Sequence, residues 1–238
     1  MNGKTLYIDD GHGMETAGKR TPVFPDGHEL AGMQIRENEF NRAVADKLHE
    51  LAKFEGYRVV MTAVEDTDVP LSVRTDRANL DMTKMGLGIV DTAFISVHYN
   101  AFNGEWDGKR GGIEVYHYPW SAAGTCLAIA IQEELIKGTA QIDRGTKEAN
   151  FHVLRETIMP AVLVEAGFMD CLAEAERMLD PAFQDEVARE ILNGINDYFG
   201  ITPCAQCQVL RDQVEKLELE CSALRARLNQ IADIAKGE

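Results

Sequence analysis

Short apolar runs alternate with segments of helical periodicity along the first 200 or so residues of the chain. Five runs rich in apolar and β-branched residues have the length and composition of strands. They occupy Thr5–Asp9, Tyr57–Thr62, Ala93–His98, Gly112–Tyr116 and Ala161–Glu165. Because strands that alternate with helices favour parallel pairing, the pattern predicts an α/β fold. We expect a mostly parallel, mixed sheet with helices on both faces.

Two of the helical segments have a clear apolar period. After Glu37, apolar residues recur every three or four positions at Phe40, Val44, Leu48 and Leu51. A second series follows Asp180-Pro181 and comprises Phe183, Val187, Ile191, Ile195 and Phe199. Asp is a favoured N-cap residue and Pro suits the first helical turn, so this helix is expected to begin there.

The C-terminal segment has a different pattern. Gly200 to Pro203 interrupts the apolar periodicity. We therefore expect a catalytic domain at 1–200, a linker at 201–206 and a helix at 207–238. Apolar positions of this helix alternate at spacings of three and four, at Cys207, Leu210, Val214, Leu217, Cys221, Leu224, Leu228 and Ile231. This heptad spacing predicts a coiled coil and hence a homo-oligomer. The alternative is an amphipathic helix that packs on its own domain.

Composition excludes several classes of partner. The 39 acidic and 24 basic residues give a formal charge of -15, which argues against nucleic acid as the main partner. No apolar run approaches the length of a membrane span, and the N-terminus lacks the pattern of a secretory signal. We expect synthesis in the cytoplasm and no membrane insertion. The five scattered cysteines form no disulfide framework, although Cys204 and Cys207 could hold zinc between two chains.

Three side chains of possible catalytic value lie where an α/β sheet forms its binding site. His12, His98 and Glu165 each lie at or just past the end of a predicted strand, and Glu37 begins the first helix. Two His and one Glu leave an open position on zinc for water, and a further carboxylate can then move protons. This chemistry assigns His12, Glu37 and His98 as zinc ligands and Glu165 as the catalytic acid and base. A structural role is the alternative, because a His after a strand or a Glu at a helix start is commonly structural.

Several segments also match a known family in order. They are Ile8–Gly13, Arg36–Asn41, Leu71–Arg74 with Ala78-Asn79, Phe94–Ala101, Arg144-Gly145, Asn150–Arg155 and Met159–Phe168. Together they resemble the zinc-dependent N-acetylmuramoyl-L-alanine amidases of the amidase-3 type, over about residues 4–199. The resemblance implies hydrolysis of the amide bond between N-acetylmuramic acid and L-alanine in peptidoglycan.

The resemblance also implies residue roles. It places His12, Glu37 and His98 on zinc and makes Glu165 catalytic, and the choice of Glu37 over Glu39 depends mainly on it. Two residues of the matching segments, Asn100 and Asn150, are expected to contact substrate. Three positions depart from the usual family pattern and leave the details of substrate recognition open: Asp10, Tyr99 and Cys171.

Other functions and settings stay open at this point. One is a zinc peptidase that cuts within the stem peptide, and another is an inactive scaffold that binds the wall. A wall-cutting enzyme without a signal peptide resembles a phage or prophage endolysin, which acts on the wall after release through a membrane lesion. A host enzyme of mother-cell lysis is the alternative. The remaining histidines are interpreted as structural or surface residues, with His28 and His117 nearest the cleft: His28, His49, His117 and His152.

Overall fold

The computed structural model describes residues 2–106, 111–201, 224 and 227. The chain divides into two units, Met1–Ile201 and Thr202–Glu238, and the fold described below is that of the first. The predicted linker and coiled-coil helix lie outside the described residues, apart from Leu224 and Arg227. Cys204 and Cys207 lie outside them as well.

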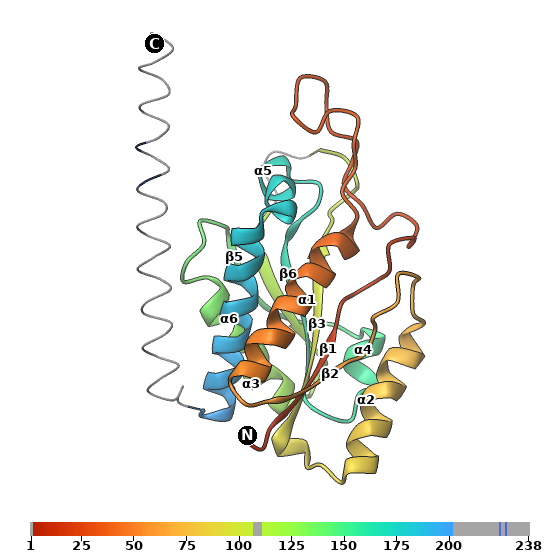
Figure 1. Ribbon diagram of the computed structural model, residues 1–238, viewed down its shortest axis with the longest axis vertical. Helices are drawn as coiled ribbons and strands as arrows, with labels where there is room; N and C mark the ends of the chain where they lie inside the picture. The colour runs from red at the N-terminus through yellow and green to blue at the C-terminus, as the bar shows by residue number, and fades with distance from the viewer. Residues whose placement is uncertain (1, 107–110, 202–223, 225–226, 228–238) are drawn as a thin grey trace. The chain divides into compact units, whose positions relative to one another are not determined.

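A six-stranded sheet forms the centre of the fold (Figure 1). Its strands are β1 (Thr5–Asp9), β2 (Arg58–Met61), β3 (Thr92–Asn100), β4 (Ile113–His117), β5 (Asp143–Glu148) and β6 (Ala161–Phe168). They lie in the order β2-β1-β3-β6-β4-β5. Strands β2, β1, β3 and β6 are parallel, whereas β4 runs antiparallel to β6 and parallel to β5. The predicted mostly parallel, mixed sheet is therefore confirmed.

Strand β5 has no counterpart in the predicted set. Its sequence is polar, and half of its residues are exposed. Because β5 lies at the edge of the sheet and, among the described strands, pairs with β4 alone, it buries no continuous apolar face that a sequence pattern could reveal. Strands β3 and β6 also continue beyond the ends that the apolar runs predict, to Asn100 and Phe168.

Helices cover both faces of the sheet. On one face lie α1 (Glu37–Phe54), α3 (Ala122–Leu135) and α6 (Pro181–Phe199), and on the other lie α2 (Leu71–Met85) and α4 (His152–Arg155). Along β1, Leu6 and Ile8 belong to the first core and Tyr7 to the second, as the alternation of side chains in a strand requires. Shorter elements complete the unit: α5 (Leu172–Ala175) and 3-10 helices at Ile89–Asp91 and Glu176–Leu179.

Helix α6 begins as its sequence predicts. The Asp180 side chain accepts a hydrogen bond from the Ala182 N–H at 2.9 Å, and Pro181 occupies the first turn. The helix ends at Gly200, whose φ of 63° is the left-handed conformation that glycine adopts without strain. The backbone conformation of Gly200 therefore explains why α6 ends at this position.

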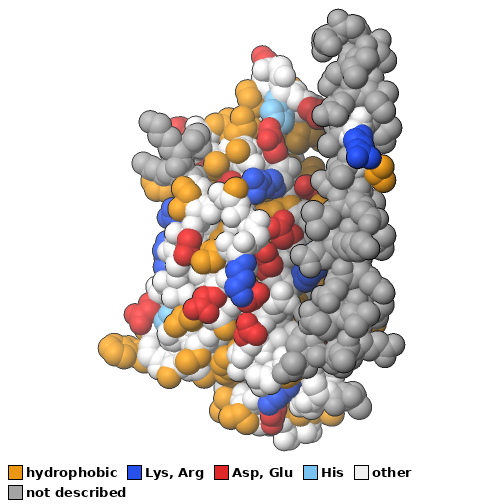
Figure 2. All heavy atoms as spheres, turned by 90° about the vertical axis from the view of Figure 1, so that its left-hand side faces the viewer, with side chains coloured by type: hydrophobic (Ala, Val, Ile, Leu, Met, Phe, Trp, Pro, Cys, Tyr) orange, Lys and Arg blue, Asp and Glu red, His pale blue; other side chains and the backbone are white. Residues whose placement is uncertain are grey.

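The surface shows mixed charge. On the face drawn in Figure 2, acidic and basic side chains of the described residues are interspersed. None of the described helices combines the length and the apolar character that a bilayer span requires.

Candidate metal and catalytic centre

The predicted site residues meet at the carboxyl ends of the parallel strands. Strands β1, β3 and β6 are parallel, so their carboxyl ends lie together. His12 follows β1, whereas His98 lies in β3 directly beside Glu165 of β6. Topology thus brings together side chains that are separated by more than 150 residues in the sequence.

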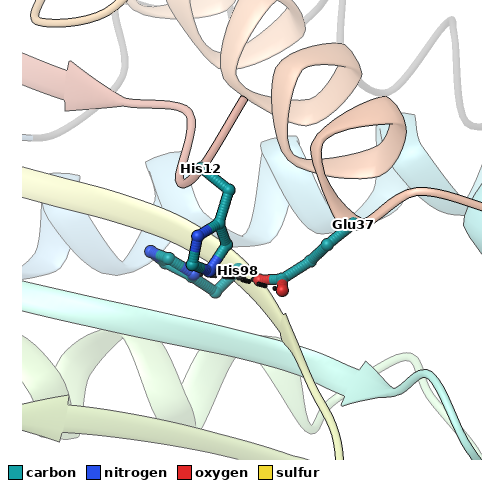
Figure 3. A group of neighbouring side chains, drawn as sticks. All are labelled: His12, Glu37 and His98. Carbon is teal, nitrogen blue, oxygen red and sulfur yellow. Dashed lines mark hydrogen bonds and ion pairs between the residues drawn. The ribbon is translucent and has the colours of Figure 1, made fainter. Parts of the chain in front are cut away.

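His12, Glu37 and His98 form a compact cluster (Figure 3). One potential ligand atom from each residue lies within 4.8 Å of the other two. His12 Nε2 is 3.4 Å from Glu37 Oε2, and His98 Nδ1 is 3.0 Å from Glu37 Oε1. The two imidazole rings meet edge to face, with centroids 4.9 Å apart.

The protonation states of this cluster suit a metal ion. Burial lowers the pKa of His12 to about 4, although the negative charge of Glu37 opposes this shift. Burial alone would raise the pKa of Glu37, but its hydrogen bond to His98 and the charges of His98 and His12 hold it below its ordinary value. A neutral imidazole and an ionised carboxylate are the forms that bind metal.

Two potential ligand atoms of the cluster lack hydrogen-bond partners within the described part of the chain, and they show whether the cluster suits a metal ion. His12 Nε2 and Glu37 Oε2 are buried and have no hydrogen-bond partner among the described residues. Such atoms are rare in folded proteins, and a shared cation would satisfy both. Two imidazole nitrogens and one carboxylate oxygen are also the donor set of open metal sites. The residues therefore fit a divalent metal ion.

Helix α1 separates the roles of Glu37 and Glu39. Glu37 is the first residue of the helix and is 1% exposed. Its Oε1 also lies 3.3 Å from the backbone N–H of Tyr99, which can donate to it. Glu39 instead accepts a hydrogen bond from the backbone N–H of Arg36 at 3.1 Å, as in a capping box. Of the two, Glu37 faces the histidines.

The loop that carries His12 is held in an unusual conformation. His12 has a φ of 62°, which is uncommon for a residue with a side chain. Its carbonyl accepts hydrogen bonds from Arg74 Nη2 at 2.6 Å and Asn38 Nδ2 at 3.3 Å. Gly11 allows the close approach of His98, because a Cβ there would lie 2.5 Å from His98 Cε1. Neighbouring elements thus fix the direction of the His12 side chain.

A buried polar chain supports the second histidine. His98 Nε2 lies 3.0 Å from Ser96 Oγ, which donates to Asp9 Oδ2 at 2.6 Å. Asp9 Oδ1 accepts from Arg74 Nη1 at 2.7 Å. Burial would raise the pKa of Asp9, but Arg74 and Ser96 hold it below its ordinary value. Arg74 therefore binds the backbone carbonyl of His12 and also Asp9, which in turn holds Ser96 beside His98. These supporting roles of Arg74, Ser96 and Asp9 were not identified from the sequence.

Glu165 has a different environment from Glu37. Its Oε2 is buried and has no hydrogen-bond partner among the described residues. Burial raises its pKa well above the ordinary value, and the negative charges of Glu37 and Glu114 add to this effect. A raised pKa favours the protonated form of a carboxyl group, and that form can act as an acid.

A cavity of about 520 Å³ opens beside this centre. Its walls combine the candidate site residues with an apolar side formed by Val69, Pro70, Leu71, Phe151, Val153 and Leu163. His152 also lines the cavity, whereas His28 contacts Glu176 and His117 contacts Thr125. The expectation that His28 and His117 lie nearest the cleft is therefore wrong, because α4 turns His152 towards it.

The two asparagines expected to contact substrate lie outside the lining of this cavity. Asn100 Nδ2 donates to Glu114 at 2.7 Å, and Asn100 Oδ1 accepts from the Ala101 N–H. Asn150 is exposed, and its Oδ1 accepts from Arg155 Nη1 at 2.7 Å. Their contact with substrate stays a prediction.

Comparison with known proteins agrees with this arrangement. Residues 6–197 match the N-acetylmuramoyl-L-alanine amidase family, which is more than half of the chain. The chain belongs to this amidase family. It is 32% identical to the N-acetylmuramoyl-L-alanine amidase CwlM of Bacillus licheniformis, over 98% of this chain and 80% of that protein.

Two further matches cover most of the amidase domain. The chain is 29% identical to the sporulation-specific N-acetylmuramoyl-L-alanine amidase of Bacillus subtilis, over 92% of this chain and 77% of that protein. The crystal structure of an N-acetylmuramoyl-L-alanine amidase from Clostridium difficile 630 superposes with a TM-score of 0.69 at 29% identity. That match covers 84% of this chain and 98% of the other.

Proposed function

We propose that this amidase hydrolyses the bond between N-acetylmuramic acid and L-alanine in peptidoglycan, with zinc held by His12, Glu37 and His98. Family membership and relatives named as N-acetylmuramoyl-L-alanine amidases support the reaction. The observation that carries the metal assignment is the pair of buried ligand atoms that have no hydrogen-bond partner among the described residues, in a cluster spanning 4.8 Å.

The donor set favours zinc among the common divalent ions. Mg²⁺ and Ca²⁺ prefer all-oxygen ligands, whereas two imidazoles and one carboxylate suit zinc. Zinc bound there would polarise the scissile carbonyl. It would also lower the pKa of a water molecule towards neutrality, which makes the water a better nucleophile.

Glu165 has the properties that the proton transfers require. The amide C–N bond can break only when the departing nitrogen of L-alanine receives a proton. The raised pKa of Glu165 favours the protonated form of its carboxyl group, which can donate that proton. The hydroxyl of the attacking water joins the carbonyl carbon, and the remaining proton of the water returns Glu165 to its acid form. Atoms and charges therefore balance over one turnover.

Digestion of purified peptidoglycan tests the reaction and the metal together. The protein as isolated, the chelator-treated protein and the protein with zinc restored are compared by product mass and by new free amino groups. We expect new L-alanine amino groups, loss of activity with chelator and recovery with zinc. Full activity without metal would contradict the zinc assignment. New amino groups elsewhere in the stem peptide would indicate a peptidase, and no products at all would indicate a scaffold.

We also propose that residues 207–238 form a coiled coil that makes the enzyme a dimer or small oligomer. The heptad spacing of apolar residues supports this proposal. Its test is the solution mass of the full chain under reducing conditions, compared with a version that ends at Gly200. Monomers in both cases at micromolar concentration would contradict it. The endolysin-like setting, in which the enzyme reaches the wall after release, stays a prediction as well.

A further inference from the structure

A strip of charged and aromatic side chains lies beside Glu165 on β4 and β5. It consists of Glu114, Tyr116, Arg144 and Lys147. Strand pairing places Glu114 of β4 directly beside Glu165, and Tyr116 beside Leu163. Lys147 of β5 lies in turn beside Tyr116. Residues directly opposite one another on neighbouring strands point to the same face of a sheet. Glu114, Tyr116 and Lys147 therefore share the face that carries Glu165.

The centre of this strip is a fully occupied carboxylate. Glu114 is 1% exposed and accepts hydrogen bonds from Asn100 Nδ2 at 2.7 Å, Tyr116 Oη at 2.5 Å and Arg144 Nε at 2.6 Å. It also accepts one from Lys147 Nζ. A carboxylate offers about four acceptor positions, so these four donors use all of them. Glu114 thus orients the donors around it and has no position left for a ligand.

The strip carries one more positive charge than negative, because Arg144 and Lys147 share the single charge of Glu114. Their side chains are 32% and 34% exposed. Arg144 Nε donates to Glu114, and Arg144 Nη1 donates to the Gly111 carbonyl at 3.4 Å. Arg144 Nη2 has no hydrogen-bond partner among the described residues. The Lys147 ammonium has three N–H groups, and Glu114 is its one hydrogen-bond partner among the described residues. Unused donors with a surplus positive charge are the arrangement that binds a carboxylate.

The position of the strip relative to Glu165 suggests which part of the substrate it meets. His98 lies on one side of Glu165 in the sheet, and Glu114 lies on the other. In the proposed reaction the scissile carbonyl lies beside the histidines and the departing nitrogen beside Glu165. The peptide attached to that nitrogen then continues over β4 and β5. Strands are about 4.8 Å apart, so β5 lies roughly 10 Å from β6. An extended peptide covers that distance in about three residues.

We propose that Lys147 and Arg144 form a subsite for a free carboxylate in the peptide part of the substrate, within about three residues of the scissile amide. This inference rests on the proposed amidase function. The Tyr116 ring lies under the Lys147 ammonium at 5.9 Å and 5.2 Å from the Phe151 ring, which lines the central cavity. These two rings join the cavity to the subsite and offer an apolar path for the intervening peptide.

A purely structural role for Lys147 makes a different prediction. One cation is sufficient to neutralise Glu114, and Arg144 already provides it. If Lys147 only stabilised Glu114, its loss would affect all substrates equally. If Lys147 binds the peptide, its loss affects only substrates with a carboxylate in reach.

Two synthetic substrates separate these cases. Both are N-acetylmuramoyl-L-alanyl dipeptides, and they differ only in whether the second residue ends in a carboxylate or a carboxamide. The wild-type enzyme is expected to prefer the carboxylate about tenfold in kcat/KM, mainly through KM, and less at high salt. Lys147→Met should lower activity on the carboxylate to the wild-type level on the carboxamide, whereas Lys147→Arg should keep most of the preference.

A matched lysine provides the control. Lys137 also pairs with one carboxylate, Glu134, but lies just past the end of α3 on the opposite face of the sheet. Lys137→Met should leave the preference unchanged. Equal wild-type cleavage of the two substrates would overturn the inference without affecting the proposed function, and so would an equal loss on both in Lys147→Met. Cleavage of neither substrate by the wild type would contradict the proposed function and this inference with it.

Discussion

The candidate centre contains two glutamates, Glu37 of α1 and Glu165 of β6, whose surroundings shift their pKa values in opposite directions. At the start of α1, Glu37 faces His12, His98 and Lys19, and these partners hold its pKa below the ordinary value against the effect of burial. On β6, Glu165 has no hydrogen-bond partner on its buried oxygen, and burial together with nearby negative charge raises its pKa. The surroundings, and not the residue type, therefore suit Glu37 to the proposed metal binding and Glu165 to the proposed proton transfer.

Removal of Glu37, the proposed metal-binding carboxylate, should have the largest effect. Glu37→Ala leaves two histidines without their shared anionic partner. We expect loss of bound zinc and a fall in activity of more than about a thousandfold. Zinc content per chain and peptidoglycan digestion measure the two effects. Glu39→Ala is the matched control, because Glu39 caps the same helix and should cost stability while leaving zinc content intact.

Replacement of the second carboxylate should separate chemistry from metal binding. Glu165→Gln keeps the shape of the side chain but removes its transferable proton. Activity is expected to fall on the order of a hundredfold or more, with zinc retained. Glu148→Gln on the exposed edge strand serves as the control. A Glu165→Gln enzyme that digests wall at the parent rate would show that the proton-transfer role is misassigned.

A smaller effect is expected from the support of His98. Ser96→Ala removes the hydroxyl that lies between His98 Nε2 and Asp9. Loss of such a supporting partner lowers metal affinity by about 10–100-fold. Competition with a chromogenic chelator measures this affinity directly. Ser72 is an exposed serine of α2, and Ser72→Ala should leave the metal affinity unchanged. Equal metal affinities for the two variants would show that Ser96 does not support metal binding.

The smallest effect concerns acid stability of the metal-free protein. His12 has a folded pKa of about 4, below its ordinary 6.5, so the unfolded chain binds more protons between these values. Stability is therefore complete above pH 6.5 and is lost as the pH falls towards 4. The loss should not exceed about 3.4 kcal/mol. Denaturant unfolding at several pH values measures it, and a His12→Gln protein with the same pH slope would contradict this origin.

Sequence reasoning succeeded where local pattern and chemistry coincide. The apolar runs located five strands because buried strands need continuous apolar side chains. His12, His98 and Glu165 were chosen as candidates because each lies at or just past the end of such a run, where α/β sheets bind ligands, and the structure brings these residues together. The polar strand β5 escaped because an exposed edge strand has no such requirement.

The sequence by itself determined the fold class, the family and the identity of the candidate ligands, since these depend on periodicity and residue type. Tertiary structure alone decided which neighbours each group meets. It turned Glu37 rather than Glu39 towards the histidines, and it brought Arg74 to Asp9 across 65 positions of sequence. It also placed Lys147 on the face of Glu165. Such long-range contacts set burial and local charge, and these in turn decide whether a carboxylate holds a metal or a proton.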